Sequence, residues 1–524
     1  MYAPTCLIFL VSFSSPHCLE SVESVQPFRI IAQSGVPVAG SQAEPLGEMM
    51  YATMTQSGDL YLICQSNPVV SSIVGGKLVP LIQSHRQEMT NSKGGTSICE
   101  LRLESRPGYG GNNRPLTTWG PDAQVAELGT IVQNSSSGTR SQSIIWWGKD
   151  GGRAIEVPSD PDDGANVSVT LQRIDAIVFV DSKTIAFSGA VNMTYPNGNA
   201  TSSSQRVWIA RAADAKAELI IDLEKPPGGK PAVSSRANTV AQLWSNQRGT
   251  LLVASPSGEF WTWDKGTPRL LLSDKAGKEN LGTSGNEFYQ PKTAIVDVDG
   301  RVVVRGTTAQ RNGTLALGTL DQSGTCSDIM RSFDVDPSPG SGPEAYRWSK
   351  SISFAEHIQY RTDSTGKHMA FLMDELYADA DGKEDEARTW QGLYVGAMPG
   401  QLTAILRLAE PASEESADSV VGSISDACIG AQGDIWILGT IRPRALGFYD
   451  RSKDVQAIWH WRPGRKSSIV FVHDGSQGDL DLSPLSLVGP AKDIDGGGIY
   501  VLARVVIDRD RGFTAPALLQ IDAH

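Results

Sequence analysis

Short runs in which apolar and polar residues alternate fill most of this chain, and glycine-containing turns separate them. Seven segments share one form, a tight turn with a glycine that leads into a β-rich run; the glycines are Gly58, Gly129, Gly249, Gly300, Gly366, Gly433 and Gly497. An eighth segment has Lys183 at the glycine position. Alternation with a period of two predicts strands, whereas the 3.6-residue period of amphipathic helices is almost absent. The pattern therefore predicts an all-β protein and excludes a helical solenoid.

A second hairpin follows each of these turns, so each unit is expected to hold four strands, A to D. The segment 392–406 has this form, with a Gly-Leu-Tyr-Val strand, a Pro-Gly turn and a Leu-Thr-Ala-Ile-Leu strand. The seven steps from Gly58 to Gly497 average about 63 residues, a period that suits one propeller blade with loops. Four short antiparallel strands per repeat predict a single β-propeller of eight four-stranded blades. Because Lys183 departs from the pattern, a count of seven blades stays open.

The two ends of the chain complement each other. The last unit, from about 491 to 521, has no fourth strand after it, and an apolar run at 28–34 precedes the first unit. Pairing of the 28–34 strand with the last unit would complete the last blade and remove an open sheet edge. We therefore predict one propeller domain over residues 25–524.

The repeated unit resembles repeats in uncharacterised secreted bacterial β-propeller proteins. The strands and Pro-Gly turn of 392–406 carry the resemblance, and the opening 30–40, where an apolar strand runs into a Gly- and Pro-containing loop, is similar to the start of such repeats. The resemblance covers most of the chain and implies a fold. It implies no catalytic residues.

The first residues predict export. An apolar run at 6–13 is followed by small and polar residues, so residues 1–24 are predicted to be a signal peptide or a disordered leader, and the protein to be secreted, periplasmic or attached to the cell surface. No run of 18 apolar residues occurs, which predicts no transmembrane segment. The net charge of −12 argues against a nucleic-acid partner.

Loop lengths predict which face of the propeller carries function. The A–B and C–D turns are short and belong to one face, whereas the B–C and D–A connections of the other face are expected to be long loops. The expected long loops are 193–204, 374–388 and 442–453 between strands B and C, and 85–115, 273–290 and 410–419 between strands D and A. Long loops on a rigid scaffold are where binding residues concentrate.

Two of these loops carry candidate sites. Arg442, Arg444, Tyr449 and Arg451 could grip an anionic glycan or a carboxylate, since arginine pairs bidentately with such groups; the alternative is a solvated loop. Asp379, Asp381 and Glu384 surround a glycine in an oxygen-rich arrangement that could hold Ca²⁺; the alternative is a solvated acidic loop.

Asp297, in an Asp-Val-Asp-Gly turn, is expected to have a structural role. Tryptophan pairs at strand C are expected to pack between blades rather than to stack on sugars; they are Trp146/Trp147, Trp261/Trp263 and Trp459/Trp461.

Catalytic motifs are missing from the sequence. It contains no HExxH, GxSxG, Walker A or strand-linked GxGxxG motif. We therefore expect a secreted or surface-exposed binding scaffold whose partner is an extracellular protein or a glycan. Two alternatives stay open: an extracellular enzyme that acts on a glycan or another polymer, and a calcium-stabilised adhesion or structural module.

Overall fold

The structure is a computed structural model, and it describes most of the chain between residues 28 and 522. The described ranges are 28–36, 46–55, 58–65, 69–74, 77–90, 96–101, 116–132, 140–148, 151–157, 168–194, 201–214, 216–223, 241–255, 259–272, 288–308, 315–320, 326–331, 346–348, 361–362, 368–378, 384–397, 402–413, 418–430, 432–446, 451–473, 486–491, 497–508 and 510–522. The predicted leader, 1–24, lies outside them.

Strands dominate these ranges, and the all-β class is confirmed. The only helix they contain is a single 3-10 turn, η3 (Arg444–Leu446), in front of β31. Within the described ranges, no helix has the length and apolarity that crossing a membrane requires.

The described strands form eight antiparallel sheets, which we number 1 to 8 in chain order. Sheet 1 holds β2 (Met49–Met54), β3 (Leu60–Cys64), β4 (Val70–Val74) and β5 (Lys77–Ile82); sheet 2 holds β6 (Arg86–Thr90), β7 (Thr96–Glu100), β8 (Thr117–Gly120), β9 (Gln124–Val132), β10 (Arg140–Gly148) and β11 (Gly151–Ile155). Sheet 3 holds β12 (Ser168–Asp181), β13 (Thr184–Thr194), β14 (Thr201–Arg211) and β15 (Glu218–Asp222); sheet 4 holds β16 (Gln242–Ser245), β17 (Thr250–Ala254), β18 (Phe260–Asp264) and β19 (Arg269–Leu272).

The second half of the chain repeats this organisation. Sheet 5 holds β20 (Phe288–Val296), β21 (Val302–Thr308), β22 (Leu315–Leu320) and β23 (Cys326–Arg331); sheet 6 holds β24 (Tyr346–Trp348), β25 (Arg361–Thr362), β26 (His368–Ala378), β27 (Glu384–Ala397) and β28 (Leu402–Arg407). Sheet 7 holds β29 (Ser419–Ile429), β30 (Ile435–Pro443), β31 (Val455–Trp461) and β32 (Ser468–His473); sheet 8 holds β33 (Ser486–Ala491), β34 (Gly498–Asp508), β35 (Phe513–Asp522) and β1 (Phe28–Gln33).

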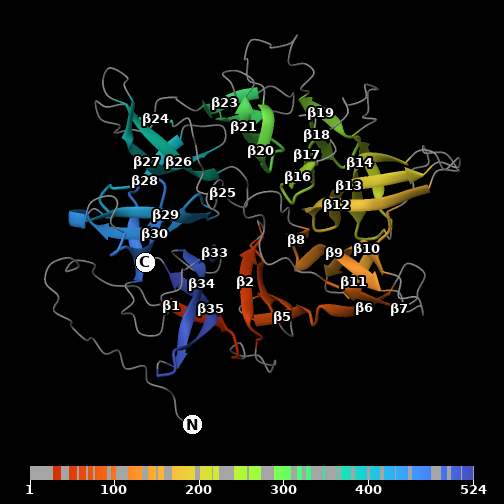
Figure 1. The fold of residues 1–524 in the computed structure, drawn as a ribbon, viewed down its shortest axis with the longest axis horizontal. Helices are drawn as coiled ribbons and strands as arrows, with labels where there is room; N and C mark the ends of the chain where they lie inside the picture. The colour runs from red at the N-terminus through yellow and green to blue at the C-terminus, as the bar shows by residue number, and fades with distance from the viewer. Residues whose placement is uncertain are drawn as a thin grey trace.

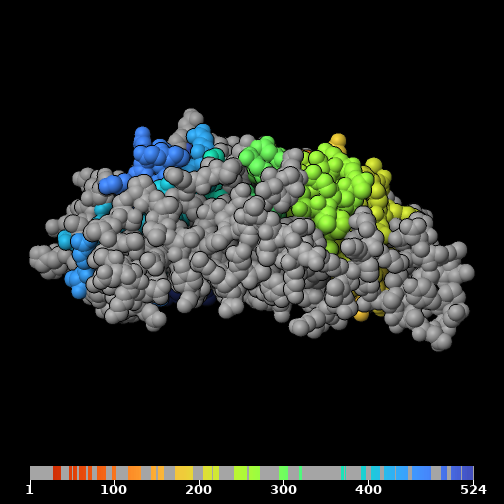
Figure 2. Space-filling model, turned by 90° about the horizontal axis from the view of Figure 1, so that it is seen from above, coloured from red at the N-terminus to blue at the C-terminus, as the bar shows by residue number. Residues whose placement is uncertain are grey.

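The eight sheets follow one another around a ring in chain order (Figure 1). Strands of neighbouring sheets contact each other, β8 with β12, β12 with β16, β16 with β20 and β29 with β33, and β33 also contacts β2 of sheet 1. Apolar side chains of facing sheets fill the space between them, as where Phe187 and Trp208 of sheet 3 pack with Trp146 of sheet 2. Figure 2 shows the ring along its edge, with described residues of sheet 4 (yellow-green) and of sheet 7 (blue) among those visible from this side.

Strand β1 is the outermost strand of sheet 8, although it comes first in the chain. It pairs antiparallel with β35, with Phe28 opposite Ile521 and Gln33 opposite Ala517. Arg29 Nη2 donates to Gln520 Oε1 at 2.7 Å, and the Phe28 ring meets that of Phe471 in sheet 7 edge-on. The apolar run expected at 28–34 therefore joins the two ends of the ring through one sheet.

Glycines occupy most of the turns between the first and second strands, as the pattern predicts. Gly58, Gly249, Gly300, Gly433 and Gly497 all have positive φ, which an L-residue adopts only at a cost. At Lys183 the turn needs no glycine, because the Asp181 carboxylate accepts the Lys183 N–H at 2.8 Å. Gly366 lies outside the described residues.

The turn expected at Gly129 is wrong. Gly129 lies inside β9, and the turn of sheet 2 is at 121–123, where Asp122 and Ala123 take positive φ without a glycine. Gly129 is needed for another reason: a Cβ there would lie 2.6 Å from the Ile145 side chain and 3.0 Å from Cys99 Sγ. A glycine required by close packing inside a strand cannot be told from a turn glycine in the sequence, so the pattern did not distinguish the two.

The long loop expected at 85–115 is also wrong over 86–90 and 96–100. These segments are β6 and β7, which pair with each other and add to sheet 2. Strand β9 is shared, since β8 pairs with its first half, Gln124–Glu127, and β7 with its last residues, Thr130–Val132. The sequence pattern of 86–100 is compatible with strands, but it does not indicate which strand they pair with.

Two expected B–C loops contain strand as well. Strands β13 and β14 reach Thr194 and Thr201, and β26 and β27 reach Ala378 and Glu384, so hairpins replace half of 193–204 and most of 374–388. The structure thereby shortens the loops predicted for this face.

Backbone bulges require glycine at two further positions. Strands β12 and β29 both bulge where they pair with the second strand of their sheet, and Gly189 and Gly439 lie opposite these bulges. A Cβ on Gly189 would lie 2.3 Å from the Arg173 carbonyl oxygen, and a Cβ on Gly439 would lie 2.1 Å from that of Ser423. Backbone atoms cannot yield as side chains can, so only glycine fits at these two positions.

The tryptophan pairs pack between sheets, as predicted. Trp146 and Trp147 point to opposite sides of sheet 2, into the clusters shared with sheets 3 and 1. Trp261 and Trp263 face sheet 3 together, whereas Trp459 is fully buried against sheet 6 residues and donates from Nε1 to the Ala412 carbonyl oxygen at 2.8 Å.

Candidate functional site

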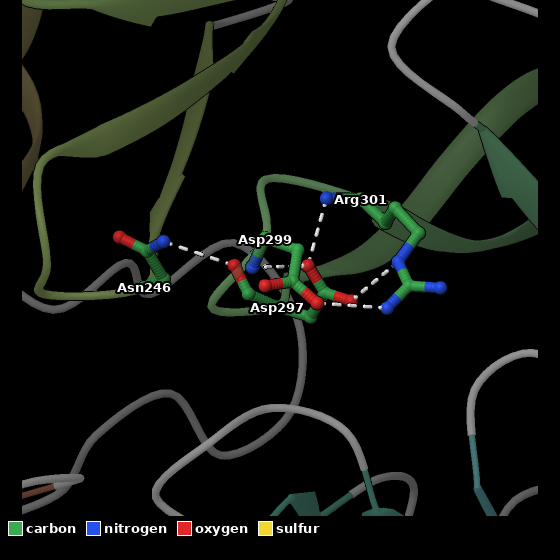
Figure 3. Close-up of polar contacts among 4 residues, drawn as sticks. All are labelled: Asn246, Asp297, Asp299 and Arg301. Carbon is green, nitrogen blue, oxygen red and sulfur yellow. Dashed lines mark hydrogen bonds and ion pairs between the residues drawn. The ribbon is translucent and has the colours of Figure 1, made fainter.

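Polar groups on the face of the first-to-second-strand turns hold the sheets together. Asp297, fully buried, begins the turn of sheet 5, and its Oδ1 accepts the N–H groups of Asp299 and Arg301, both at 2.8 Å. Arg301 Nε lies 2.9 Å from Asp297 Oδ2, and Arg301 Nη2 lies 2.9 Å from Asp299 Oδ2 (Figure 3). Asn246 of the sheet 4 turn donates from Nδ2 to the Asp297 carbonyl oxygen at 2.9 Å, which ties sheet 4 to sheet 5.

Asn246 has the same position in its own turn. Its Oδ1 accepts the N–H groups of Arg248 at 2.9 Å and Thr250 at 3.1 Å, as Asp297 Oδ1 accepts those of its turn. Side-chain oxygens at this position replace the backbone partners that a tight turn lacks. The structural role predicted for Asp297 agrees with these contacts.

We expect Asp297→Ala to lower the free energy of unfolding by about 2–3 kcal/mol, because three hydrogen bonds to a buried carboxylate are lost. Asp297→Asn keeps an acceptor for the two backbone N–H groups and loses only the ion pair, so its loss should be roughly half as large. Urea unfolding of the two variants beside the parent protein measures both. Equal losses in the two variants would contradict the turn-capping role.

A histidine and an aspartate meet on the same face, in sheet 7. His460 Nε2 lies 3.1 Å from Asp434 Oδ2, and the His460 ring stacks on Trp436 with 4.2 Å between ring centroids. The Gly433 that precedes Asp434 lies against His368 of sheet 6. A His–Asp pair can orient a proton acceptor, but nucleophilic catalysis also needs a nucleophile within hydrogen-bond reach of the histidine. In the described ranges, the Ser468 hydroxyl that approaches His460 at 3.3 Å donates to its carbonyl oxygen and not to its ring.

Three of the predicted ligand-binding residues, Arg442, Arg444 and Arg451, lie at the other end of sheet 7, where β30 ends and before β31 begins. Arg442 and Asp454 form a bidentate ion pair there, Nε to Oδ1 at 2.6 Å and Nη2 to Oδ2 at 2.7 Å. The side chains of Arg442 and Asp454 are only 3% and 12% exposed, and Thr440 Oγ1 adds a hydrogen bond to Asp454 Oδ2 at 3.1 Å. Arg442 is thus committed to a partner inside the protein.

The other predicted residues differ from Arg442. Arg444 begins η3 and is exposed, and Arg451 is exposed on the far side of the same connection. Lys453, which the sequence did not single out, is exposed beside them. Tyr449 lies outside the described residues. The structure brings Arg444 and Arg451 to the two ends of one connection and places Arg442 beneath it.

Asp454 is the residue that sequence reasoning missed here. Ile441 pairs with Val455 in the hairpin of β30 and β31, so Arg442 and Asp454 are the next pair along the same register. Opposite charges on the two strands of one hairpin indicate an ion pair, but only when the register in which the strands pair is known.

The proposed calcium ligands belong to the connection between β26 and β27. Glu384 is the first residue of β27 and pairs with Ala378, whereas Asp379 and Asp381 lie outside the described ranges. Over the ranges that are described, no group of three or more His, Cys, Asp or Glu side chains is arranged to hold a metal ion. Calcium binding at Asp379, Asp381 and Glu384 stays a prediction.

Two buried thiols are poor nucleophiles. Burial raises the pKa of Cys64 to about 11. Burial, with the negative charges of Glu127 and Glu100, raises the pKa of Cys99 to about 12. Both therefore stay protonated at neutral pH, and the thiolate is the reactive form.

Comparison with known proteins gives a likeness in fold at low identity. No family model matches the chain, and no curated protein matches it. Among solved structures, it is similar to the β-propeller domain of the Trilobed protease from Pyrococcus furiosus, at 11% identity over 78% of this chain and 92% of that one, with a TM-score of 0.33. It is also similar to YCF48 bound to D1 peptide, at 11% identity over 78% and 95% with a TM-score of 0.26, and to a Penicillium chrysogenum α-L-arabinanase complexed with arabinobiose, at 9% over 78% and 94% with a TM-score of 0.23. At these TM-scores, no ligand, activity or number of sheets follows for this chain.

Proposed function

We propose that this chain is a secreted or surface-exposed β-propeller of eight blades that serves as a binding scaffold, with an anionic extracellular ligand bound at the β30–β31 connection. Six of the blades would have four strands, as the sequence predicts, whereas sheet 2 has six and sheet 6 has five. Each of the eight sheets would be one blade, and β1 would complete the eighth. The ring order of the sheets and the contact between β33 and β2 support this architecture.

The positive charge of the β30–β31 connection supports the choice of an anionic ligand. Residues 442–454 include four cations, Arg442, Arg444, Arg451 and Lys453, and two acids, Asp450 and Asp454, whereas the whole chain has a net charge of −12. The buried Arg442–Asp454 pair neutralises itself and braces the base of the connection. The exposed cations Arg444, Arg451 and Lys453 are then left for a ligand. Guanidinium groups favour carboxylates and sulfates, which they bind through paired hydrogen bonds.

The test compares an acidic polysaccharide, such as a sulfated or uronic-acid glycan, with neutral dextran by isothermal titration calorimetry. We expect binding of the acidic polymer only, and weaker binding as salt is added, since exposed charges are screened. The double variant Arg444→Ala/Arg451→Ala should lose at least about tenfold in affinity, the equivalent of one good charged contact.

A matched control removes two cations from the opposite end of the same strand. Arg465 and Lys466 are exposed and follow β31, whereas the candidate connection precedes β31. Arg465→Ala/Lys466→Ala changes the net charge equally and should leave the affinity within about twofold. An equal loss in both double variants would mean attraction by overall charge, and failure of the parent protein to bind any acidic glycan would remove this ligand class.

A further inference from the structure

Among the described residues, the interface between sheets 3 and 4 buries two side-chain oxygens that accept no hydrogen bond, together with one unpartnered donor, Trp261 Nε1. Asp175 of β12, Gln205 of β14 and Glu259 just before β18 are only 8%, 8% and 6% exposed. Gln205 Oε1 and Glu259 Oε2 have no hydrogen-bond partner. A buried oxygen without a donor costs free energy, so a cation or a hydrogen-bond donor that reached these oxygens would stabilise the fold.

Strand alternation directs both of these side chains into the same interface. Val207 of β14 and Trp261 of β18 pack together in the core between the two sheets. Gln205 and Glu259 each lie two positions before one of these residues, and side chains two apart share a face. Gln205 is six positions from Arg211, where β14 ends, and Glu259 is five from Asp264, where β18 ends, so the two lie at similar heights in the interface.

The hydrogen bonds that are present orient the unpartnered oxygens. Gln205 Nε2 donates to Asp175 Oδ2 at 3.3 Å, which turns Gln205 Oε1 away from Asp175. Arg173 Nε lies 2.8 Å from Asp175 Oδ1 and balances the charge of that carboxylate. The Glu259 N–H donates to Ser255 Oγ at 3.1 Å, which fixes the start of β18. One negative charge, that of Glu259, remains on the sheet 4 side of the interface.

We propose that this interface binds a divalent cation, Ca²⁺ by preference, with the Glu259 carboxylate and Gln205 Oε1 as ligands and Asp175 beside them. Carboxylate and amide oxygens are the ligands of Ca²⁺, which accepts water for its remaining positions. An amide oxygen takes the place of a third acidic ligand here. The site is separate from Asp379, Asp381 and Glu384 and does not depend on the proposed glycan binding.

The test is thermal unfolding of the whole chain in EDTA and then with Ca²⁺ or Mg²⁺, together with Tb³⁺ luminescence excited through tryptophan. At a hundredfold excess over the dissociation constant, Ca²⁺ should raise Tm by about 2–3 °C for a chain of this length. Trp261 packs in the same interface, so bound Tb³⁺ should luminesce. In Glu259→Gln the new amide N–H₂ can donate to Gln205 Oε1; this variant should be more stable than the parent protein in EDTA and should lose both cation responses.

Two controls separate this site from others. Glu218→Gln removes a 56% exposed carboxylate from sheet 3 and should keep both responses, as should Asp379→Asn/Asp381→Asn. A response that survives Glu259→Gln, or that disappears in Asp379→Asn/Asp381→Asn, would overturn the proposal. So would a parent protein that ignores the cations while Glu259→Gln is stabilised in EDTA, because a buried water or a shared proton would then satisfy the two oxygens.

Discussion

Replacing β1, residues 28–33, by a Gly-Ser segment of equal length should lower the free energy of unfolding by about 5 kcal/mol or more. The strand supplies five residue pairs to β35, buries Ala32 and places Phe28 against Phe471 of the neighbouring sheet. Without it, β35 becomes an open edge beside apolar residues, a template for association with other chains. Urea unfolding and size-exclusion chromatography measure the two effects.

A graded pair of variants keeps this test informative if the replaced chain does not fold. Ala32→Pro removes one ladder donor from a buried position and should cost about 3 kcal/mol. Ile30→Thr changes a side chain that is 44% exposed on the same strand and should cost less than about 0.5 kcal/mol. Similar stability of the two variants would mean that β1 is only a loosely attached edge strand.

Removal of Arg442 should have the second largest effect. Arg442→Ala leaves the Asp454 carboxylate, 12% exposed, without its bidentate partner, and we expect a loss of about 3–5 kcal/mol. Asp454→Ala leaves an arginine side chain that is 3% exposed and should cost a similar amount. The measurement is the urea midpoint of each single variant and of the pair.

The double variant Arg442→Met/Asp454→Leu is the discriminating control. Because apolar side chains of similar size need no charge partner, it should recover most of the stability that either single change removes. Additive losses in the double variant would show that the two residues act independently, contrary to their 2.6 and 2.7 Å contacts.

The local pattern predicted elements better than it predicted partners. Alternation and turn glycines identified the turns at Gly58, Gly249, Gly300, Gly433 and Gly497, because positive φ favours one residue type. The prediction of a turn at Gly129 was wrong, because the sequence alone does not distinguish a glycine required by close packing from one required by a turn. The hairpin β6–β7 was read as a loop because strand pairing is decided by residues far away in the chain.

The candidate site was predictable only in part, for the same reason. Arg444 and Arg451 are exposed, as a binding loop requires, but Arg442 is held by Asp454 through a register that the sequence does not state. The oxygens of Gln205 and Glu259 belong to different sheets, and neither residue has a local motif that marks it. The proposed cation site depends on two strand faces that meet only when sheets 3 and 4 pack together.

The closed ring is tested most directly by a disulfide between its two ends, in the double variant Arg29→Cys/Gln520→Cys. These residues are partners across β1 and β35, and cross-strand partners lie within the reach of a disulfide. We predict a 29–520 link within single chains, found by peptide mapping of the monomeric fraction, and none in the control Arg29→Cys/Arg465→Cys. Two unlinked cysteines under the same oxidising conditions, or links only between chains, would contradict the ring closed by β1.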